Sequence, residues 1–424
     1  MVTAADVHLW GQQVGTVLWD EHLVCSHFEY APEFIRGGLE VSPIMMPLAR
    51  KVYSFPDRDS YKTFLGLPGM LAEALPDAFG RALLDNWLAA QGRQDANPVE
   101  RLCFQGKRSM GALEFVPSME RVLDAEQAIE VDSLVQAAHE ALSNKEAFVT
   151  NLSKSDEALL DIIRVGTSAG GQRAKAVIAY NDTTGEVRSG QTTAPEGFDY
   201  WLIKLDGVTN KELGDPEHWG EVEYVHSLLA KAAGINMTEC RLYRENGRAH
   251  FMTKRFDRSN GEKIHMQTLC GLAHYDFNRL HAYSYEQAFA VMRQLRLTYP
   301  EAEEFYRRMV FNVVARNQDD HTKNISFLMD KQGVWHLSPA YDMSWAYNPT
   351  GGWTSMHQMS VNNKWDHITR EDLLHVAYEM NIKHAPAIID QVVEAVSMWS
   401  KLAKEQTDIP QNIIDAIEKT RAYL

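Results

Sequence analysis

A chain of 424 residues exceeds one average domain and predicts two or three packed units with sizeable cores. Its composition, with 45% hydrophobic and 23% charged residues, is that of a globular protein and excludes a disordered or fibrous chain. The formal net charge of −15 argues against a broad basic surface for nucleic acid, so any DNA contact should be local or made through a partner.

The cysteines and the apolar segments of the sequence indicate in which cellular compartment the protein is located. No CxxC pair occurs among the four cysteines, which favours reduced, buried thiols over a disulfide framework or a zinc site. They are Cys25, Cys103, Cys240 and Cys270. The first residues show no basic segment followed by an apolar one, because Asp6, His8 and Asp20 interrupt it. No later run reaches about eighteen apolar residues. We therefore expect a cytoplasmic protein that does not contact membranes.

The N-terminal part is predicted to form a small β-rich domain. Residues Val7 to Val17 alternate around a Gly11-Gln12-Gln13 turn and predict a hairpin, and a further strand is expected near Cys25 to Tyr30. A helix is expected from Ala78 to Ala90, with Asp77 as its N-cap.

A domain boundary is predicted after Pro117. A loop at residues 106–111 precedes an expected strand from Ala112 to Val116, and the chain then becomes acidic and helical from Met119 to Ser143. The first domain is accordingly assigned to residues 1–117.

The rest of the chain is predicted to be a mostly β lobe followed by a mostly helical one. Strands are expected near Ile162–Val165, Ala174–Tyr180 and Tyr200–Leu205, and a helix from Pro216 to Ala233, closed by Gly234. From about residue 267 the pattern is mainly helical. This order predicts an α+β fold, protein-kinase-like and two-lobed, with domains at 118–265 and 266–424.

The most informative segment is a polar loop at residues 316–324. Apolar residues recur every fourth position upstream, at Phe305, Met309 and Val313, and predict a helix with one apolar face. Asp319 and Asn324 have the D-x-x-x-x-N spacing of a protein-kinase catalytic loop. There the aspartate orients and accepts the proton of the substrate hydroxyl, and the asparagine holds a magnesium ion.

A predicted hairpin follows this loop. Strands at Ile325–Met329 and Val334–Leu337, joined by a turn at Asp330–Gly333, lead into Ala340-Tyr341-Asp342. In kinases a hairpin at this place leads to the second metal-binding aspartate, that of the D-F-G motif. Asp342 is therefore predicted to bind Mg²⁺.

Two other interpretations of the polar loop stay open. It could be a solvated cluster at the end of a helix, in which Asp319 or Asp320 only faces water. A transition-metal site built from Asp319, Asp320 and His321 is disfavoured, because no second histidine stands at i,i+4 spacing nearby. Magnesium fits better, provided that the oxygens of Asn324 and Asp342 converge.

A glycine-rich segment at residues 166–175 is a candidate phosphate loop. Its small residues would let backbone N–H groups approach phosphate oxygens. The candidates are Gly166, Thr167, Ser168, Gly170, Gly171 and Lys175. The segment matches neither the Walker A motif nor G-x-G-x-x-G, so a plain hairpin turn is the alternative.

A lysine at the end of an apolar strand is a second candidate contact for the nucleotide. Trp201-Leu202-Ile203-Lys204 resembles the V-A-I-K strand, whose lysine contacts the α- and β-phosphates. Glu221 or Glu223 on the following helix could orient Lys204. The alternative is that all three are ordinary surface residues.

At these residues the chain resembles, over nearly its whole length, the HipA family of serine/threonine-kinase toxins from bacterial toxin–antitoxin pairs. Residues 317–324 and 326–328 resemble the family's catalytic segment, and residues 337–342 its metal-binding segment. Residues 166–175 are similar to the family's phosphate loop, which contains an autophosphorylated serine. Either Thr167 or Ser168 can correspond to that serine. Segments at residues 42–48, 75–77 and 111–113 resemble the family's small N-terminal domain.

The resemblance also implies ligands and partners. ATP and Mg²⁺ would be the cofactors, with Lys204 on the ATP-contacting lysine of the family. Residues 254–258 resemble the segment whose backbone meets adenine, although Lys254 stands where an acidic residue is expected. Further nucleotide contacts are implied at Lys254, Phe256, His321 and Tyr341. The implied partners are a protein substrate and a helix-turn-helix antitoxin of HipB type, with DNA bound only through the antitoxin.

Two alternative functions accompany the protein-kinase interpretation. A small-molecule kinase would use the same D-x-x-x-x-N and aspartate apparatus, and no activation segment is evident in the sequence. A catalytically silent, nucleotide-binding component of a repressor complex is the other. The joint presence of Asp319, Asn324, Asp342 and Lys204 speaks against the silent form.

Overall fold

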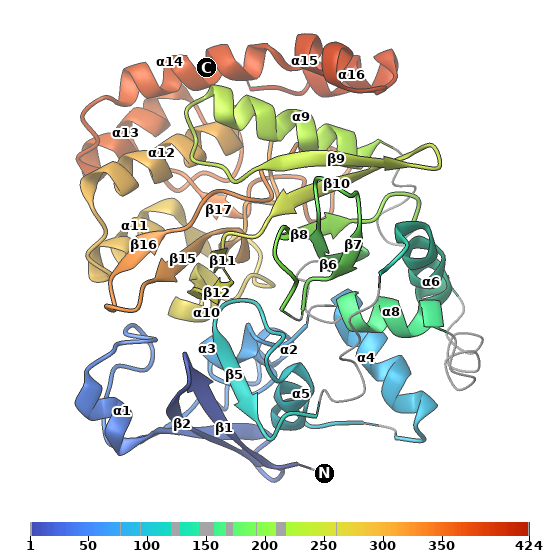
Figure 1. Ribbon diagram of the computed structural model, residues 1–424. Coiled ribbons are helices and arrows are strands. Elements are labelled where there is room, and N and C mark those ends of the chain that lie inside the picture. Colours follow the sequence, from blue (N-terminus) through green and yellow to red (C-terminus); the bar gives the residue numbers. More distant parts are fainter. Residues whose placement is uncertain are drawn as a thin grey trace. The chain divides into compact units, whose positions relative to one another are not determined.

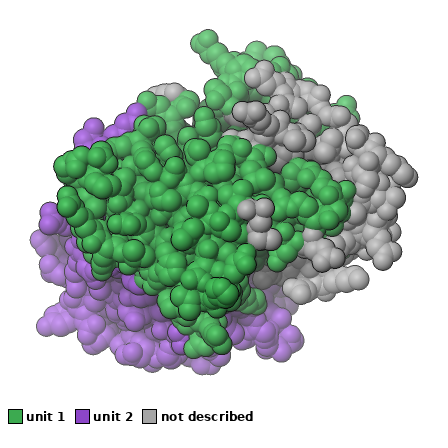
Figure 2. Space-filling model, turned by 90° about the horizontal axis from the view of Figure 1, so that it is seen from below, with its two compact units in different colours: residues 1–42, 46–217, 243–266 green, residues 43–45, 218–242, 267–424 purple. Residues whose placement is uncertain are grey.

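The chain is described by a computed structural model. It describes residues 2–76, 78–93, 95–119, 128–143, 157–166, 173–191, 193–208, 218–259, 261–422 and 424. Two compact units are present, coloured separately in Figure 2. Unit 1 comprises Met1–Ser42, Met46–Glu217 and Tyr243–Met266, and unit 2 comprises Pro43–Met45, His218–Leu242 and Gln267–Leu424.

Unit 1 begins with a five-stranded sheet in the order β4-β3-β2-β1-β5 (Figure 1). Its strands are β1 (Ala4–Leu9), β2 (Gln12–Asp20), β3 (Cys25–Tyr30), β4 (Val52–Ser54) and β5 (Leu113–Val116). All neighbours are antiparallel. The β1–β2 turn has φ of 50° at Trp10 and 81° at Gly11, and two positive φ values match the twist of a hairpin. The predicted first hairpin and the strand at residues 25–30 are confirmed.

Five helices lie between β3 and β5 in the chain: α1 (Pro32–Gly37), α2 (Tyr61–Phe64), α3 (Gly69–Ala72), α4 (Ala78–Ala90) and α5 (Pro98–Gln105). Helix α5 begins at an Asn97 cap, whose side chain accepts a hydrogen bond from Glu100 N at 2.9 Å. The predicted bounds of α4 are confirmed, whereas its predicted cap, Asp77, lies outside the described residues.

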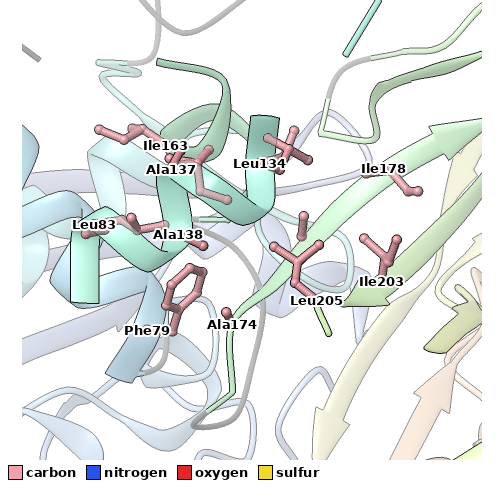
Figure 3. Close-up of a cluster of buried hydrophobic side chains, with 14 of the residues drawn as sticks. Phe79, Leu83, Leu134, Ala137, Ala138, Ile163, Ala174, Ile178, Ile203 and Leu205 are labelled. Atoms are coloured by element: carbon pink, nitrogen blue, oxygen red, sulfur yellow. The ribbon is translucent and has the colours of Figure 1, made fainter. Parts of the chain in front are cut away.

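The second sheet has the order β7-β6-β8-β10-β9. Its strands are β6 (Lys175–Tyr180), β7 (Val187–Ser189), β8 (Asp199–Lys204), β9 (Cys240–Glu245) and β10 (Arg248–Lys254), and a small ribbon of β11 (Arg258–Ser259) and β12 (Glu262–Lys263) follows. One face of the sheet packs on α4, α6 (Val131–Ser143) and α8 (Glu157–Gly166), and Figure 3 shows side chains of this core.

Helix α8 replaces a predicted strand. Ile162, Ile163 and Val165 were expected in extended structure, but they are buried residues of a ten-residue helix. The local run of β-branched residues favours a strand, whereas the apolar spacing over the longer segment is helical. Packing of that helical face on α4 and α6 overrides the β propensity.

Unit 2 is mainly helical (Figure 1). Its helices are α9 (Trp219–Ala232), α10 (Leu269–Ala273), α11 (Tyr285–Gln294), α12 (Tyr299–Val314), α13 (Arg370–Met380), α14 (Ala385–Ser397), α15 (Trp399–Gln406) and α16 (Gln411–Glu418). Helix α14 packs on both α9 and α12. The helix predicted from residue 216 is described from Trp219 and is followed by Gly234, with φ of 80°.

Short strands carry the loops of unit 2. Strands β13 (His265–Thr268), β15 (Ser326–Met329) and β16 (Trp335–Leu337) form one sheet, with β15 in the centre. Strands β14 (Tyr283–Ser284) and β17 (Met359–Ser360) form a parallel pair. The predicted β15–β16 hairpin is confirmed, and its turn is closed by a hydrogen bond from Asp330 N to Val334 O.

All four cysteines are buried thiols, and burial raises the pKa of Cys103 to about 12, with a further contribution from Glu100.

No helix in the described part of the chain is long and apolar enough to cross a bilayer.

Asp372 in the first turn of α13 yields a pH prediction. Burial acts to raise its pKa, but hydrogen bonds from Lys364, the Thr369 N–H group and Asn362 lower it from 3.8 to about 2. A lowered folded-state pKa stabilises the fold above the unfolded value, and this contribution is lost as the pH falls towards 2. We expect Asp372→Ala to lower the free energy of unfolding at pH 7 by about 2 kcal/mol.

Urea unfolding of wild type and Asp372→Ala between pH 7 and pH 3.5 checks this expectation. The difference between the two proteins should narrow below pH 4. A difference that stays constant with pH would contradict the assignment of the shift to this carboxylate.

Candidate active site

Helix α12 leads directly into the polar loop at residues 316–324. The helix begins where Thr298 N donates to Glu301 Oε2 at 2.7 Å, and its apolar face is buried as predicted, at Phe305, Met309 and Val313. Arg316 then adopts φ of 56°, which ends the helical path and turns the chain into the loop.

The two adjacent aspartates of this loop have different environments. The Asp320 side chain is fully buried and accepts three hydrogen bonds, from Tyr285 Oη at 2.8 Å, His357 Nδ1 at 2.9 Å and Gln358 N at 2.7 Å. The Asp319 side chain is 43% exposed. Asp320 is therefore a structural anchor, and Asp319 is the carboxylate that a second molecule can reach.

Asp319 is held by two ring systems. Trp353 Nε1 donates to its Oδ1 at 2.5 Å, and His321 Nε2 lies 3.7 Å from the same oxygen. Desolvation raises the pKa of the Asp319 carboxyl, and the charges of Asp342 and Asp320 add to this, whereas His321 and the Trp353 hydrogen bond lower it. The exposed part of the side chain limits the size of the rise.

Asn324 and Asp342 flank Asp319 and fit a hard cation. Asn324 Nδ2 donates to Asp319 O at 2.9 Å, which leaves the amide oxygen directed elsewhere. Asp342 is close enough to raise the pKa of Asp319, and it adopts φ of 51°. No group of three or more His, Cys, Asp or Glu side chains arranged for a metal occurs in the described ranges. One amide oxygen and one carboxylate, completed by phosphates and water, suit Mg²⁺.

A buried chain of hydrogen bonds connects the loop to the Asp342 segment. Tyr285 Oη, which donates to Asp320, accepts from Asn312 Nδ2 at 2.9 Å. Asn312 Oδ1 accepts from Asn317 Nδ2 at 2.8 Å, and the same Asn317 amide group lies 3.2 Å from Asp342 O. Burial and the Asp320 charge raise the pKa of Tyr285 well above its usual range, so its hydroxyl stays a donor. The network thus connects the Asp320 side chain to the backbone at Asp342, one of the two predicted metal-binding positions.

Two further predicted residues in unit 2 have structural contacts. Tyr341 Oη donates to Lys323 O at 2.8 Å and is also hydrogen-bonded to Ser326 Oγ, so it joins the second segment to β15. The His321 ring lies against Phe277, with 5.2 Å between centroids. Their predicted contacts with a nucleotide stay predictions.

In unit 1 two predicted lysines lie side by side. Lys175 on β6 is directly opposite Lys204 on β8, so both side chains project from the same face of the sheet. Lys204 Nζ lies 5.7 Å from the centroid of the Phe251 ring on β10. Two cationic side chains on one face of the sheet are suited to bind phosphate oxygens.

Lys254 lies on the opposite face of this sheet. It is paired with Trp201, three residues before Lys204, and successive residues of a strand alternate between faces. Its Nζ forms an ion pair with Asp199 at 2.7 Å. The side chain therefore does not join the two other lysines, although the predicted backbone contact with adenine does not depend on it.

Phe256 is half-buried and lies between Arg255 and Asp257, which form a buried ion pair. Asp257 accepts from Arg255 Nη2 at 2.7 Å, Arg258 Nη1 at 2.8 Å and Gly111 N at 2.7 Å. Burial acts to raise the pKa of Asp257, but the two guanidinium groups and the Gly111 N–H lower it strongly. The segment predicted to meet adenine is thereby tied to the loop before β5.

Most of the predicted phosphate loop lies outside the described residues, namely Thr167, Ser168, Gly170 and Gly171. Gly166 is the last residue of α8, and a Cβ atom there would lie 2.6 Å from Leu83 Cδ1. Close packing of α8 on α4 thus explains this glycine without a ligand.

The predicted partners of Lys204 lie on α9 in unit 2. Glu221 accepts from Asp408 N at 3.0 Å and contacts His218 Nδ1 at 2.6 Å, so it has a structural role. Glu223 is buried. Its proposed interaction with Lys204 joins residues of different units and stays a prediction.

Residues that hold the two aspartates were missed from the sequence. Trp353, His357 and Gln358 come from a segment without any catalytic motif, and Tyr285 and Asn312 read as core positions of helices. The Gly351-Gly352 pair before Trp353 indicates a turn, but nothing local indicates that the indole reaches Asp319.

Comparison with known proteins adds the family. A HipA N-terminal domain model matches residues 5–116, and a HipA-like C-terminal domain model matches residues 167–400. A protein of Sinorhizobium fredii named "Putative kinase Y4dM" is 25% identical over 271 residues, which cover 59% of this chain and 63% of that protein. The match thus spans less than two thirds of the relative's length.

A solved structure shares the fold. It is a chain from the Shewanella oneidensis MR-1 toxin–antitoxin complex of HipA, HipB and operator DNA, with a TM-score of 0.69 at 16% identity. The alignment covers 98% of this chain and 94% of that one. The fold is therefore a kinase-like α+β fold, as predicted. Because the two family models together match well over half of its residues, this chain belongs to the HipA family.

Proposed function

We propose that this protein is an ATP- and Mg²⁺-dependent serine/threonine protein kinase that acts as a HipA-type toxin. One observation carries the proposal: Asp319 is a reachable carboxylate on a D-x-x-x-x-N loop, held by Trp353 and lying beside Asn324 and Asp342. This is the arrangement that phosphoryl transfer to a hydroxyl requires.

Each residue has a distinct role in the proposed reaction. Asp319 orients the acceptor hydroxyl and takes up its proton. Asn324 and Asp342 would hold Mg²⁺, which neutralises phosphate charge when bound. Lys175 and Lys204 would bind phosphate oxygens of ATP. The acceptor oxygen forms a bond to the γ-phosphorus, the bond from that phosphorus to the bridging oxygen breaks, and ADP leaves.

The direct test uses purified protein, labelled ATP and Mg²⁺, with the phosphorylated products identified by mass spectrometry in a cell lysate. We expect phosphorylated serine or threonine in a protein. Asp342→Ala should lower both Mg²⁺-dependent ATP binding and transfer by about 100-fold or more, because a metal-ligand carboxylate is lost.

The matched control is Asp415→Ala, which removes an exposed carboxylate on α16 and should leave both unchanged. Label found only in small molecules would contradict protein-kinase activity. A wild-type protein that binds ATP but transfers no phosphate would instead indicate a silent module.

We also propose a helix-turn-helix antitoxin of HipB type as the partner. Support comes from the fold shared with the HipA chain of a complex that holds HipB and operator DNA. With a net charge of −15 this chain is poorly suited to bind DNA alone, so DNA contact is assigned to the antitoxin. The division into domains 1–117, 118–265 and 266–424 is proposed on the same family resemblance.

Autophosphorylation at Thr167 or Ser168 is a further part of the proposal. A phosphate there adds about −1.5 to −2 charges, which would repel the γ-phosphate of ATP and inactivate the enzyme. The mass spectrometry of the same reaction locates the modified residue.

A further inference from the structure

The indole of Trp353 touches the carboxylate that the proposed reaction uses. Its Nε1 lies 2.5 Å from Asp319 Oδ1, although the two residues are 34 positions apart. We infer that Trp353 is a positioning residue, whose N–H group fixes the Asp319 carboxylate so that its other oxygen faces the acceptor hydroxyl. This inference rests on the proposed function, because it assigns a helper to the catalytic aspartate.

The segment that carries Trp353 is built to hold the ring in place. Gly351 and Gly352 adopt φ of 113° and 87°, values that favour glycine, directly before the tryptophan. Asn348 N donates to Thr354 O at 3.0 Å and closes the loop around them. Trp353 therefore projects from a closed turn.

Gln358 ties this turn to the catalytic loop. Its side-chain Nε2 donates to Trp353 O, and its backbone N–H donates to Asp320 Oδ1 at 2.7 Å. With its amide oriented to satisfy both neighbours, Gln318 also donates to Thr354 O at 2.9 Å. The two neighbouring aspartates thus have different roles. Asp320 anchors the segment that carries Trp353, and the indole of Trp353 orients Asp319.

The contacts of Asp319 select one of its two oxygens. Trp353 Nε1 and, at 3.7 Å, His321 Nε2 both approach Oδ1, so Oδ2 is the oxygen left for the acceptor. A carboxylate without this hydrogen bond would rotate about its Cβ–Cγ bond and lose the aligned geometry. In Ser-His-Asp catalytic triads a buried aspartate orients the catalytic imidazole in the same way, through a hydrogen bond.

The Trp353 ring also belongs to a cluster of aromatic rings beside Asp319. Centroids of Trp353 and His321 are 6.1 Å apart, and Phe277 lies 5.2 Å from His321 and 6.5 Å from Trp353. These three rings form an aromatic wall beside Asp319. Substitution of tryptophan by phenylalanine keeps an aromatic ring in this wall and removes only the donor.

The experiment is Trp353→Phe, with steady-state kinetics for ATP and for the protein acceptor. We expect kcat to fall about 10- to 100-fold, because the Asp319 carboxylate is no longer held in the orientation that the reaction needs. KM for ATP should stay within about twofold of wild type. A merely structural role would instead change KM for ATP, kcat and the thermal midpoint together.

Trp345→Phe is the matched control. Its Nε1 donates to Thr420 Oγ1 at 2.8 Å, so the substitution removes the same kind of hydrogen bond elsewhere in unit 2. It should leave kcat unchanged. An equal loss of kcat in both variants, or none in Trp353→Phe, would overturn the inference.

A spectroscopic measurement tests the contact without activity. In protein labelled with ¹⁵N-indole tryptophan, the resonance missing from Trp353→Phe identifies the Trp353 N–H group. We expect Asp319→Ala to shift this resonance upfield and to speed its exchange with solvent, while the Trp345 resonance stays unchanged. A Trp353 resonance that does not move in Asp319→Ala would refute the positioning role, whatever the activity of the wild-type protein. An inactive wild-type protein would contradict only the proposed kinase function.

Discussion

Asp319→Asn is expected to lower phosphoryl transfer by about 10²- to 10⁴-fold, the range that a positioned general base contributes. An amide cannot take up the acceptor proton, but its oxygen can still accept the hydrogen bond from Trp353 Nε1. This substitution changes neither the buried core nor the residues that we propose to bind ATP. We therefore expect the dissociation constant for ATP to stay within about twofold of wild type.

Single-turnover transfer and equilibrium ATP binding measure the two effects separately. Asp330→Asn is the control, because Asp330 Oδ1 accepts from Gln332 N and Val334 N at 2.9 Å and an asparagine oxygen can do the same. This control should behave as wild type. Turnover at the wild-type rate in Asp319→Asn would show that another group is the catalytic base.

Asp320→Ala is expected to lower the free energy of unfolding by about 3–5 kcal/mol, although it changes the residue next to Asp319. The fully buried Asp320 carboxylate accepts from Tyr285, His357 and Gln358. Its removal leaves buried donors without an acceptor, and each such group costs about 1–3 kcal/mol.

Urea unfolding of the whole protein, monitored by tryptophan fluorescence, measures this loss. The exposed Asp415→Ala substitution should change the free energy of unfolding by less than about 0.5 kcal/mol. In contrast, Asp319→Asn should unfold like wild type. A loss of under about 1 kcal/mol in Asp320→Ala would mean that water or a rearranged side chain replaces the carboxylate.

Local signals were sufficient for most elements of the chain. The first hairpin, helix α4, the β15–β16 hairpin and the buried face of α12 follow from apolar periodicity and turn residues. The spacing of Asp319 and Asn324 likewise predicts a phosphoryl-transfer loop, and that role stays a prediction. These features depend on residues within a few positions of each other, so the sequence alone carries them.

Long-range packing decided the rest. Helix α8 forms where a short β-branched run predicted a strand, because its apolar face packs on α4 and α6. Strand register places the Lys254 side chain on the face of the sheet opposite Lys204, whereas the predicted adenine contact of Lys254 uses its backbone and stays a prediction. Neither the register nor the packing partner of a segment is set by its own residues.

From the sequence alone we predicted that an aspartate of this loop acts on the hydroxyl that accepts the phosphate, and this stays a prediction. The difference between Asp319 and Asp320 exists only in the folded protein, since two adjacent carboxylates have the same local sequence pattern. Tyr285, His357 and Gln358 surround Asp320, whereas Trp353 leaves Asp319 partly open. Those partners are 34 to 38 positions away along the chain, and their contacts exist only after the chain has folded.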